Sequence, residues 1–324
     1  MVPPPVSPPA AVRCVAVMGA TATGKSALAM QLAAEFRGEI ISMDSRQVYR
    51  GFDIGTAKPT PAERERIPHH LVDTLEPHLV SSAGRHADAV RALLPEIVAR
   101  GHVPFLVGGT GLYFRALFHG LGPVAIPREE QQRIRAGFAG RATEDMYAEL
   151  QARDPERASA LSRNDRVRIA RALEIIAFTG RPASEALRQS NGNPEVAVYL
   201  KLVLTMPRGA LRFRIAERTH ALFSAGWPEE VDRLMRAGVA PDAPAMRSLG
   251  YGELAAAIVA GADPISRLDE VITRTRQYAK RQETFFRRER DAFWLDVSNA
   301  GAPSRARGLV AAFLAAQSGA SGPQ

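Results

Sequence analysis

The sequence is poor in cysteine and in long apolar runs. It has one cysteine, Cys14, among 324 residues, which excludes an internal disulfide and a cysteine-based zinc cluster. Its apolar runs are interrupted by Arg, Asp or Gly, so none approaches the roughly 20 residues of a membrane span. The first ten residues include five prolines, without the basic stretch or cleavage signal of a secretory peptide. These absences favour a reducing, cytoplasmic setting.

Charge and composition are those of a folded globular protein. Charged residues make up 23% and hydrophobic residues 46% of the chain, which excludes a disordered or collagen-like protein. Lys and Arg outnumber Asp and Glu by 42 to 34, a formal net charge of +8. Such an excess indicates a polyanionic partner only where the basic residues cluster. The length allows two domains, or one core with a sizeable insertion.

Short apolar runs alternate with helical patterns in the first third of the chain. The runs 13–18, 39–43 and 103–107 predict strands, and each is followed by Gly or by Asp and Ser. The segments 26–36 and 83–100 have the apolar spacing of helices. Alternating strands and helices predict βαβ units and a parallel sheet.

The middle of the chain has a different amino-acid composition. From 127 to about 189, Arg, Glu, Ala and Leu dominate without any strand-like run, which predicts an all-helical insertion. The segment 196–204 returns the chain to the sheet, and 293–297 is the last predicted strand. The predicted organisation is a Pro-rich tail (1–11), a core in two pieces (12–122 and 195–317), a helical insertion (123–194) and a short tail (318–324).

A phosphate-binding loop separates the first predicted strand from the first predicted helix. Residues 19–26, GATATGKS, fit the pattern G-x-x-x-x-G-K-[ST] at every fixed position. In such a loop backbone N–H groups point inward, Lys25 neutralises phosphate oxygens, and the Ser26 hydroxyl can ligate Mg²⁺. The predicted phosphate-binding residues are Gly19, Ala20, Thr21, Ala22, Thr23, Gly24, Lys25 and Ser26. The expected fold class is α/β, with a P-loop NTPase-like parallel sheet flanked by helices.

The loop by itself leaves the chemistry open between a P-loop kinase and other phosphate-handling enzymes. A GTPase is disfavoured because the chain has no Asn-Lys-x-Asp motif. Asp44 directly follows the second apolar run, which in a doubly wound sheet places it at the carboxyl edge beside the P-loop. There it can order Mg²⁺ through water, or take a proton from an acceptor substrate.

Several longer motifs resemble those of the tRNA dimethylallyltransferases. Residues 44–51 (DSRQVYRG) and 53–59 (DIGTAKP) are similar to that family's signature. Matching motifs follow in order: Pro68-His69-His70-Leu71 with Asp73, residues 107–113 (VGGTGLY), Asn164-Asp165 with Arg168 and residues 171–174 (RALE), Gly250-Tyr251, and Lys280-Arg281-Gln282 with Thr284 and Arg287. The resemblance runs from about residue 15 to residue 294. Its departures from the family pattern are Ala20 in place of proline, Gly252 in place of a basic residue, and Phe285 in place of tryptophan.

The resemblance implies transfer of a dimethylallyl group from dimethylallyl diphosphate to N6 of adenosine 37 in tRNA, with release of diphosphate. Lys25, the P-loop amides, Mg²⁺ on Ser26 and Arg218 would hold the diphosphate. Asp44 would remove the proton of the N6 amine, and Thr110 would lie near the bridging oxygen. The implied partner is a tRNA anticodon stem-loop, and we expect a monomer because one stem-loop needs only one subunit.

A basic stretch near the C-terminus favours contact with RNA. Residues 265–290 hold eight basic and four acidic side chains. As a helix they would turn an apolar stripe inward and most of the cations outward. The predicted stripe consists of Leu268, Val271, Ile272, Tyr278, Ala279, Phe285 and Phe286. The tRNA-contacting residues that the resemblance implies are Asp44, Ser45, Arg46, Gln47, Arg133, Val167, Arg168, Ile169, Ala170, Arg171, Arg247, Tyr251, Lys280, Arg281, Arg287 and Arg288.

Three other functions remain as alternatives at this point. An enzyme that prenylates free AMP, ADP or ATP would share the P-loop and Asp44 but would not need the helical insertion or the basic stretch. A small-molecule kinase would use the same loop to move phosphate from ATP. A non-catalytic RNA-binding protein would not need Asp44 beyond binding. His69 and His70 resemble a loop of the family and make a poor zinc site without further ligands.

Overall fold

A computed structural model describes residues 12–120, 124, 126–188 and 197–316. The chain forms two compact units: Met1–Leu117 with Glu195–Gln324, here the large unit, and Phe118–Pro194, here the small unit. The sequence predicts the insertion at 123–194, whereas the small unit begins at Phe118. The predicted tail 1–11 and the tail 318–324 lie outside the described residues.

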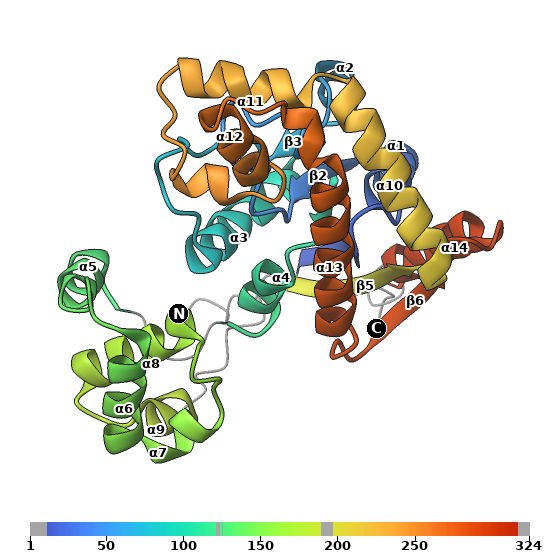
Figure 1. Cartoon of the computed structure of the whole chain (residues 1–324). Helices are drawn as coiled ribbons and strands as arrows, with labels where there is room; N and C mark the ends of the chain where they lie inside the picture. The colour runs from blue at the N-terminus through green and yellow to red at the C-terminus, as the bar shows by residue number, and fades with distance from the viewer. Residues whose placement is uncertain (1–11, 121–123, 125, 189–196, 317–324) are drawn as a thin grey trace, which may run out of the picture. The chain divides into compact units, whose positions relative to one another are not determined.

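The large unit is built on a six-stranded sheet with the order β3-β2-β4-β1-β5-β6 (Figure 1). Every neighbouring pair of strands is parallel. The strands are β1 (Val12–Gly19), β2 (Gly38–Ser42), β3 (His69–His70), β4 (Val103–Gly108), β5 (Ala197–Thr205) and β6 (Ala292–Asp296). The predicted α/β class with a parallel sheet is confirmed.

Helices surround this sheet. The α-helices that begin in the large unit are α1 (Lys25–Glu35), α2 (Pro61–Arg66), α3 (Ala83–Ala99), α4 (Gly111–Phe118), α10 (Arg208–Ser224), α11 (Trp227–Arg236), α12 (Tyr251–Val259), α13 (Leu268–Phe286) and α14 (Ala302–Ala315). Two short 3₁₀ helices, η1 (Pro244–Arg247) and η2 (Pro264–Arg267), lie in the same unit. Leu32 of α1 and Val310 of α14 belong to one apolar core with Val15 and Val17 of β1. Because side chains alternate along a strand, Ala16 faces the other side of the sheet. Figure 1 shows α13 crossing in front of the strands, where it packs against β1.

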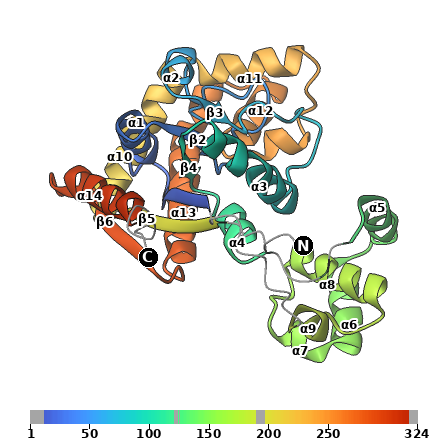
Figure 2. The ribbon, with the colours of Figure 1, turned by 180° about the vertical axis from the view of Figure 1, so that it is seen from behind.

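Helices joined by turns, without a strand, make up the described residues of the small unit (Figure 2). Its helices are α5 (Arg128–Ala136), α6 (Thr143–Arg153), α7 (Pro155–Ser159), α8 (Arg166–Thr179) and α9 (Ala183–Arg188). Met146 and Leu150 of α6 pack against Ile169 and Leu173 of α8 in its core. The predicted all-helical insertion is therefore confirmed for this part of the chain.

The sequence placed His69 and His70 in a loop, and the structure corrects this. The two residues form β3 at the edge of the sheet, paired with Ile40 and Ile41 of β2. A strand of two residues is too short to leave a periodic signal. His70 Nε2 lies 2.5 Å from Glu39 Oε2. No described His, Cys, Asp or Glu side chains form a group of three able to hold a metal ion, and no described helix is long and apolar enough to span a membrane.

The basic stretch forms a helix over only part of its length. Helix α13 ends at Phe286, so Arg287 and Arg288 follow it rather than lie on it. Val271, Ile272, Ala279 and Phe286 are buried as the predicted stripe requires. Gln282 is buried in the same row, which the sequence did not suggest.

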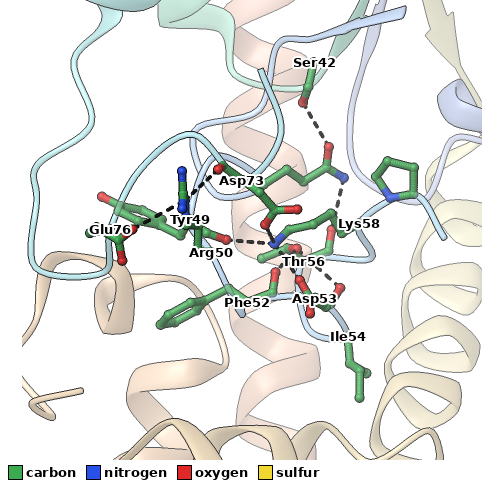
Figure 3. A network of polar contacts seen from close by, with 12 residues as sticks. Ser42, Tyr49, Arg50, Phe52, Asp53, Ile54, Thr56, Lys58, Asp73 and Glu76 are labelled. Carbon is green, nitrogen blue, oxygen red and sulfur yellow. Dashed lines mark hydrogen bonds and ion pairs between the residues drawn. The ribbon is translucent and has the colours of Figure 1, made fainter. Parts of the chain in front are cut away.

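A buried lysine organises the loop that follows β2 (Figure 3). Lys58 Nζ lies 2.6 Å from Asp53 Oδ1 and 2.5 Å from Asp73 Oδ1, and it donates to Tyr49 O at 2.7 Å. Arg64 donates to the other oxygen of Asp73 at 2.9 Å. The three donors of the ammonium are thereby satisfied, and residues 49–58 are tied to the loop around Asp73.

Replacing this lysine tests its contribution to stability. We expect Lys58→Met to lower the free energy of unfolding by about 1–3 kcal/mol, because it leaves Tyr49 O without its donor and two carboxylates without their cation. Urea unfolding measures the change. The exposed Arg66→Met on α2 is the control and should shift stability by less than about 0.5 kcal/mol. Equal stability of the two variants would contradict the assignment.

Candidate functional site

Two cavities lie in the large unit beside the carboxyl ends of β1, β2 and β4. The large chamber has a volume of about 810 Å³ and is bordered by Arg46, Arg247 and Arg281. The small chamber has about 150 Å³ and is bordered by Lys25 and Ser26. The residues that line both chambers are Thr21, Asp44, Thr56, Gly109, Arg218, Tyr278 and Gln282. The two chambers therefore meet at these residues.

The P-loop forms between β1 and α1, as the motif predicts. Gly24 caps α1 with φ of 87°, a left-handed conformation that favours glycine. Thr23 Oγ1 donates to Ala20 O at 2.8 Å, and Lys25 Nζ donates to the same carbonyl at 2.6 Å. Thr23 thus holds the loop internally, whereas Lys25 and Ser26 also line the small chamber. A ligand anion competes with one carbonyl for the lysine ammonium.

The small chamber is lined by two cationic side chains, Lys25 and Arg218, and by two carboxylates, Asp44 and Glu63. Burial, with a further contribution from the nearby Arg218, lowers the pKa of Lys25 to about 7, while Asp44 opposes the shift. Burial likewise lowers the pKa of Arg218, again against the effect of Asp44. Arg218 projects from α10, as expected from the sequence. Two neighbouring cations, each with a lowered pKa, make this part of the chamber suited to a polyanion.

Asp44 lies where the sequence predicted, directly beyond β2. The strand ends are joined at this point because Met43 N donates to Val107 O at 2.7 Å. Asp44 Oδ1 accepts a hydrogen bond from Arg46 N at 2.8 Å, which fixes the carboxylate at the junction of the chambers. One acidic group therefore faces both the phosphate-binding loop and the larger space.

Thr110 is connected to Asp44 through the backbone. Its Oγ1 accepts from Ser45 N at 3.0 Å, and its own N–H donates to Met43 O at 3.2 Å. Thr110 lines the large chamber beside this junction. Its side chain also forms a hydrogen bond with Tyr278, whose pKa is raised to about 12, chiefly by burial. Tyr278 is thus a neutral phenol at the junction of the chambers.

Four of the residues that line both chambers were not predicted as site residues: Thr56, Gly109, Tyr278 and Gln282. Thr56 and Gly109 lie in motifs that match the family, and Tyr278 and Gln282 come from α13. Tyr278 was assigned to the apolar stripe of α13, and Gln282 was only part of a matching motif. The two are four residues apart, so they share one face of the helix. Two hydrogen-bonding side chains on a face expected to be apolar were the available signal.

The other predicted tRNA residues of the large unit occupy different settings. Arg46, Arg247 and Arg281 line the large chamber with Ser45. The Gln47 side chain is bound within the protein instead, accepting from Ser42 Oγ at 2.9 Å and donating to Ala57 O at 3.1 Å. Tyr251 lines the large chamber although it is almost fully buried, and its hydroxyl donates to Glu230 Oε1 at 2.6 Å. Lys280, Arg287 and Arg288 are exposed outside both chambers.

The small unit presents some of its predicted residues and buries another. Val167 is 80% exposed at the start of α8, whereas Ile169 is fully buried in the core of the unit. A contact of Ile169 with tRNA therefore does not involve its side chain. Arg171 NH1 donates to Glu174 Oε2 at 3.1 Å, and Arg168 Nε lies 3.4 Å from Asp165 Oδ2. The remaining two are Arg133, ion-paired with Glu130, and Ala170, which is half-buried.

Comparison with known proteins gives one consistent result. A family model described as IPP transferase matches residues 47–289. A tRNA dimethylallyltransferase of Thiobacillus denitrificans is 45% identical over 309 residues, covering 93% of this chain and 97% of the relative. That of Methylococcus capsulatus is 42% identical over 305 residues, covering 93% of this chain and 97% of the relative.

Solved structures agree with this result. A tRNA isopentenylpyrophosphate transferase of Bacillus halodurans superposes with a TM-score of 0.68 at 33% identity, covering 94% of this chain and 98% of that one. A eukaryotic dimethylallyltransferase acting on tRNA superposes with a TM-score of 0.78 at 26% identity, covering 94% of this chain and 80% of that one.

The low pKa of Lys25 predicts a pH-dependent affinity for pyrophosphate. Above about pH 7 the amine is largely neutral, whereas a bound polyanion favours the ammonium, so binding takes up a proton. Relative to a Lys25→Arg variant, which stays charged, we expect the wild-type Kd to rise by up to about tenfold per pH unit between about pH 7 and 9. Calorimetry measures both constants, and the ratio cancels the ionisation of pyrophosphate itself. A constant ratio would contradict the prediction.

Proposed function

Because the chain belongs to the IPP transferase family and transfers a dimethylallyl group to tRNA, we propose that its donor is dimethylallyl diphosphate and its acceptor is N6 of adenosine 37. The observation that carries the proposal is the position of Asp44, which lines both chambers. A diphosphate beside Lys25 and a purine in the large chamber would meet at that carboxylate.

The small chamber suits the leaving group. As the allylic carbon–oxygen bond breaks, negative charge develops on the diphosphate and positive charge spreads over the allyl carbons. Lys25, Arg218 and the N–H groups of the P-loop are fixed donors for that negative charge, and they are already partly removed from water. Stabilising the leaving group in this way lowers the barrier without hydrolysis of ATP.

The junction suits the acceptor. N6 attacks the allylic carbon, the carbon–nitrogen bond forms as the carbon–oxygen bond breaks, and the proton on N6 passes to the Asp44 carboxylate. Thr110 and Tyr278 place hydroxyl groups beside this reaction centre. They would orient the bridging oxygen and the amine rather than remove protons, because the pKa of Tyr278 lies far above neutrality.

Mg²⁺ is the proposed metal. Mg²⁺ in phosphate-transfer sites is commonly held by one or two protein oxygens together with substrate phosphates and water. The exposed hydroxyl of Ser26 in the small chamber, with Asp44 in the same chamber, matches that donor set. When bound there, the ion would supply charge stabilisation to the departing diphosphate.

The acceptor base must leave the stack of an anticodon loop to reach Asp44. The large chamber, at about 810 Å³, lies within the range of small-ligand sites and is lined by five arginines: Arg46, Arg218, Arg247, Arg274 and Arg281. Lys280, Arg287 and Arg288 would contact phosphates outside it. We propose that the exposed basic side chains Arg133 and Arg168 of the small unit also contact tRNA, and that one subunit acts alone.

The alternatives are less well supported. The matched relatives are named for action on tRNA, which disfavours free adenylate as the acceptor. The same relatives are named as dimethylallyltransferases and not as kinases, which disfavours a small-molecule kinase. A non-catalytic RNA-binding protein does not explain a carboxylate placed between a phosphate cradle and a nucleotide-sized cavity.

The substrate assignment is tested with isotopically labelled dimethylallyl diphosphate. Purified protein is incubated with the donor, Mg²⁺ and either an anticodon stem-loop containing adenosine 37 or free AMP. We expect label on the stem-loop, at N6 of that adenosine by nucleoside mass spectrometry, and none on AMP. A stem-loop with guanosine at position 37 is the control. Label on AMP alone would overturn the proposal.

The role of Asp44 is tested by Asp44→Asn, which keeps an acceptor for Arg46 N but loses the basic carboxylate. We expect turnover to fall by about 10²–10⁴-fold with little change in the Kd for tRNA. Asp242→Asn, an exposed residue outside both chambers, is the matched control and should retain full rate. Near-normal turnover of the Asp44 variant would remove the base assignment.

A further inference from the structure

Gln282 joins the two sides of the reaction centre. Its side chain is 6% exposed and lies at the junction of the chambers. Its Oε1 accepts a hydrogen bond from Thr21 N of the P-loop at 2.8 Å. Its Nε2 donates to Gly109 O, directly before Thr110, at 2.9 Å. We infer that Gln282 is a positioning residue for prenyl transfer, setting the diphosphate side and the acceptor side of the site relative to each other.

The two bonds need the chemistry of an amide. One end must accept from a backbone N–H and the other must donate to a carbonyl, which a neutral Gln does with a single planar group. The lack of a side chain at Gly109 leaves room for the Gln282 amide, because a Cβ there would lie 2.2 Å from Gln282 Nε2. The fit is therefore close, and a buried partner left without its bond costs free energy.

Both partners belong to the proposed machinery. Thr21 is part of the loop that would hold the diphosphate, and Gly109 begins the turn that carries Thr110. Thr110 in turn accepts from Ser45 N, next to Asp44. A displacement of about 1 Å between donor and acceptor can cost as much as 10²-fold in rate. Gln282 spans that gap directly, so its loss should reduce turnover.

Helix α13 adds a connection to RNA. Arg281, directly before Gln282, lines the large chamber. A contact between tRNA and this helix would thus be transmitted to the P-loop through one side chain. The inference rests on the proposed function, since it assigns diphosphate to the P-loop side and the nucleotide to the Thr110 side.

The substitution Gln282→Glu separates positioning from mere packing. A protonated Glu copies the amide, with one oxygen accepting from Thr21 N and a hydroxyl donating to Gly109 O. An ionised Glu keeps the first bond but turns a second acceptor toward the Gly109 carbonyl. Burial raises the pKa of a carboxyl group, so activity should return as the pH falls.

We expect kcat of Gln282→Glu to be lower than wild type by about 10²-fold near pH 8, and the ratio to wild type to recover at least fivefold near pH 5.5. The KM for tRNA should stay within about twofold. Both proteins share the other titratable and charged groups that line the chambers, so the ratio to wild type cancels their own titration. These groups are Lys25, Asp44, Arg46, Glu63, His69, Arg218, Arg247, Tyr251, Glu253, Arg274, Tyr278 and Arg281. Gln282→Met, which makes neither bond, should be slow at every pH.

The control is Gln31→Glu, the same substitution at an exposed residue of α1, which should follow the wild-type pH profile. Circular dichroism at each pH establishes that the variants are folded. A flat ratio for Gln282→Glu, or turnover of Gln282→Met within twofold of wild type, would overturn the inference while the proposed function stands. A wild-type protein that transfers nothing to the stem-loop would overturn both.

Discussion

The parallel pairing of β1, β2 and β4 is the constraint on which the site depends. Parallel strands end at the same edge of a sheet, so the P-loop, Asp44 and the turn before Thr110 emerge side by side. Two backbone bonds hold this edge together, from Met43 N to Val107 O and from Thr110 N to Met43 O. Gly108 allows the contact, because a Cβ there would lie 2.1 Å from Met43 O.

The charged side chains at this edge of the sheet have pKa values that depend on their local surroundings. Partial desolvation lowers the pKa of both Lys25 and Arg218, and Asp44 offsets part of that effect. In the free enzyme, Lys25 and Arg218 repel each other, and a bound polyanion would reduce this repulsion. The same arrangement keeps the carboxylate close to the cations yet open to the large chamber.

The walls of the chambers are held by polar networks set back from the reaction centre. Glu230 of α11 is completely buried and accepts from Asp53 N at 3.0 Å and Ile54 N at 2.8 Å, as well as from the Tyr251 hydroxyl. Lys58 ties the same loop to Asp73. Thr56, which lines both chambers, therefore has a fixed position, although residues 53–58 form neither helix nor strand.

The sequence by itself determined the sheet, the P-loop and the position of Asp44, because strand alternation, the glycine spacing and the residue after a strand are local properties. It also marked the helical insertion through composition. Only the tertiary structure decided that Gln282 and Tyr278 reach the reaction centre from α13, that Gln47 turns into the protein, and that Ile169 packs inward. These positions depend on contacts between elements that lie far apart in the sequence. A periodic pattern predicts which side chains are buried, but it does not predict which element covers them.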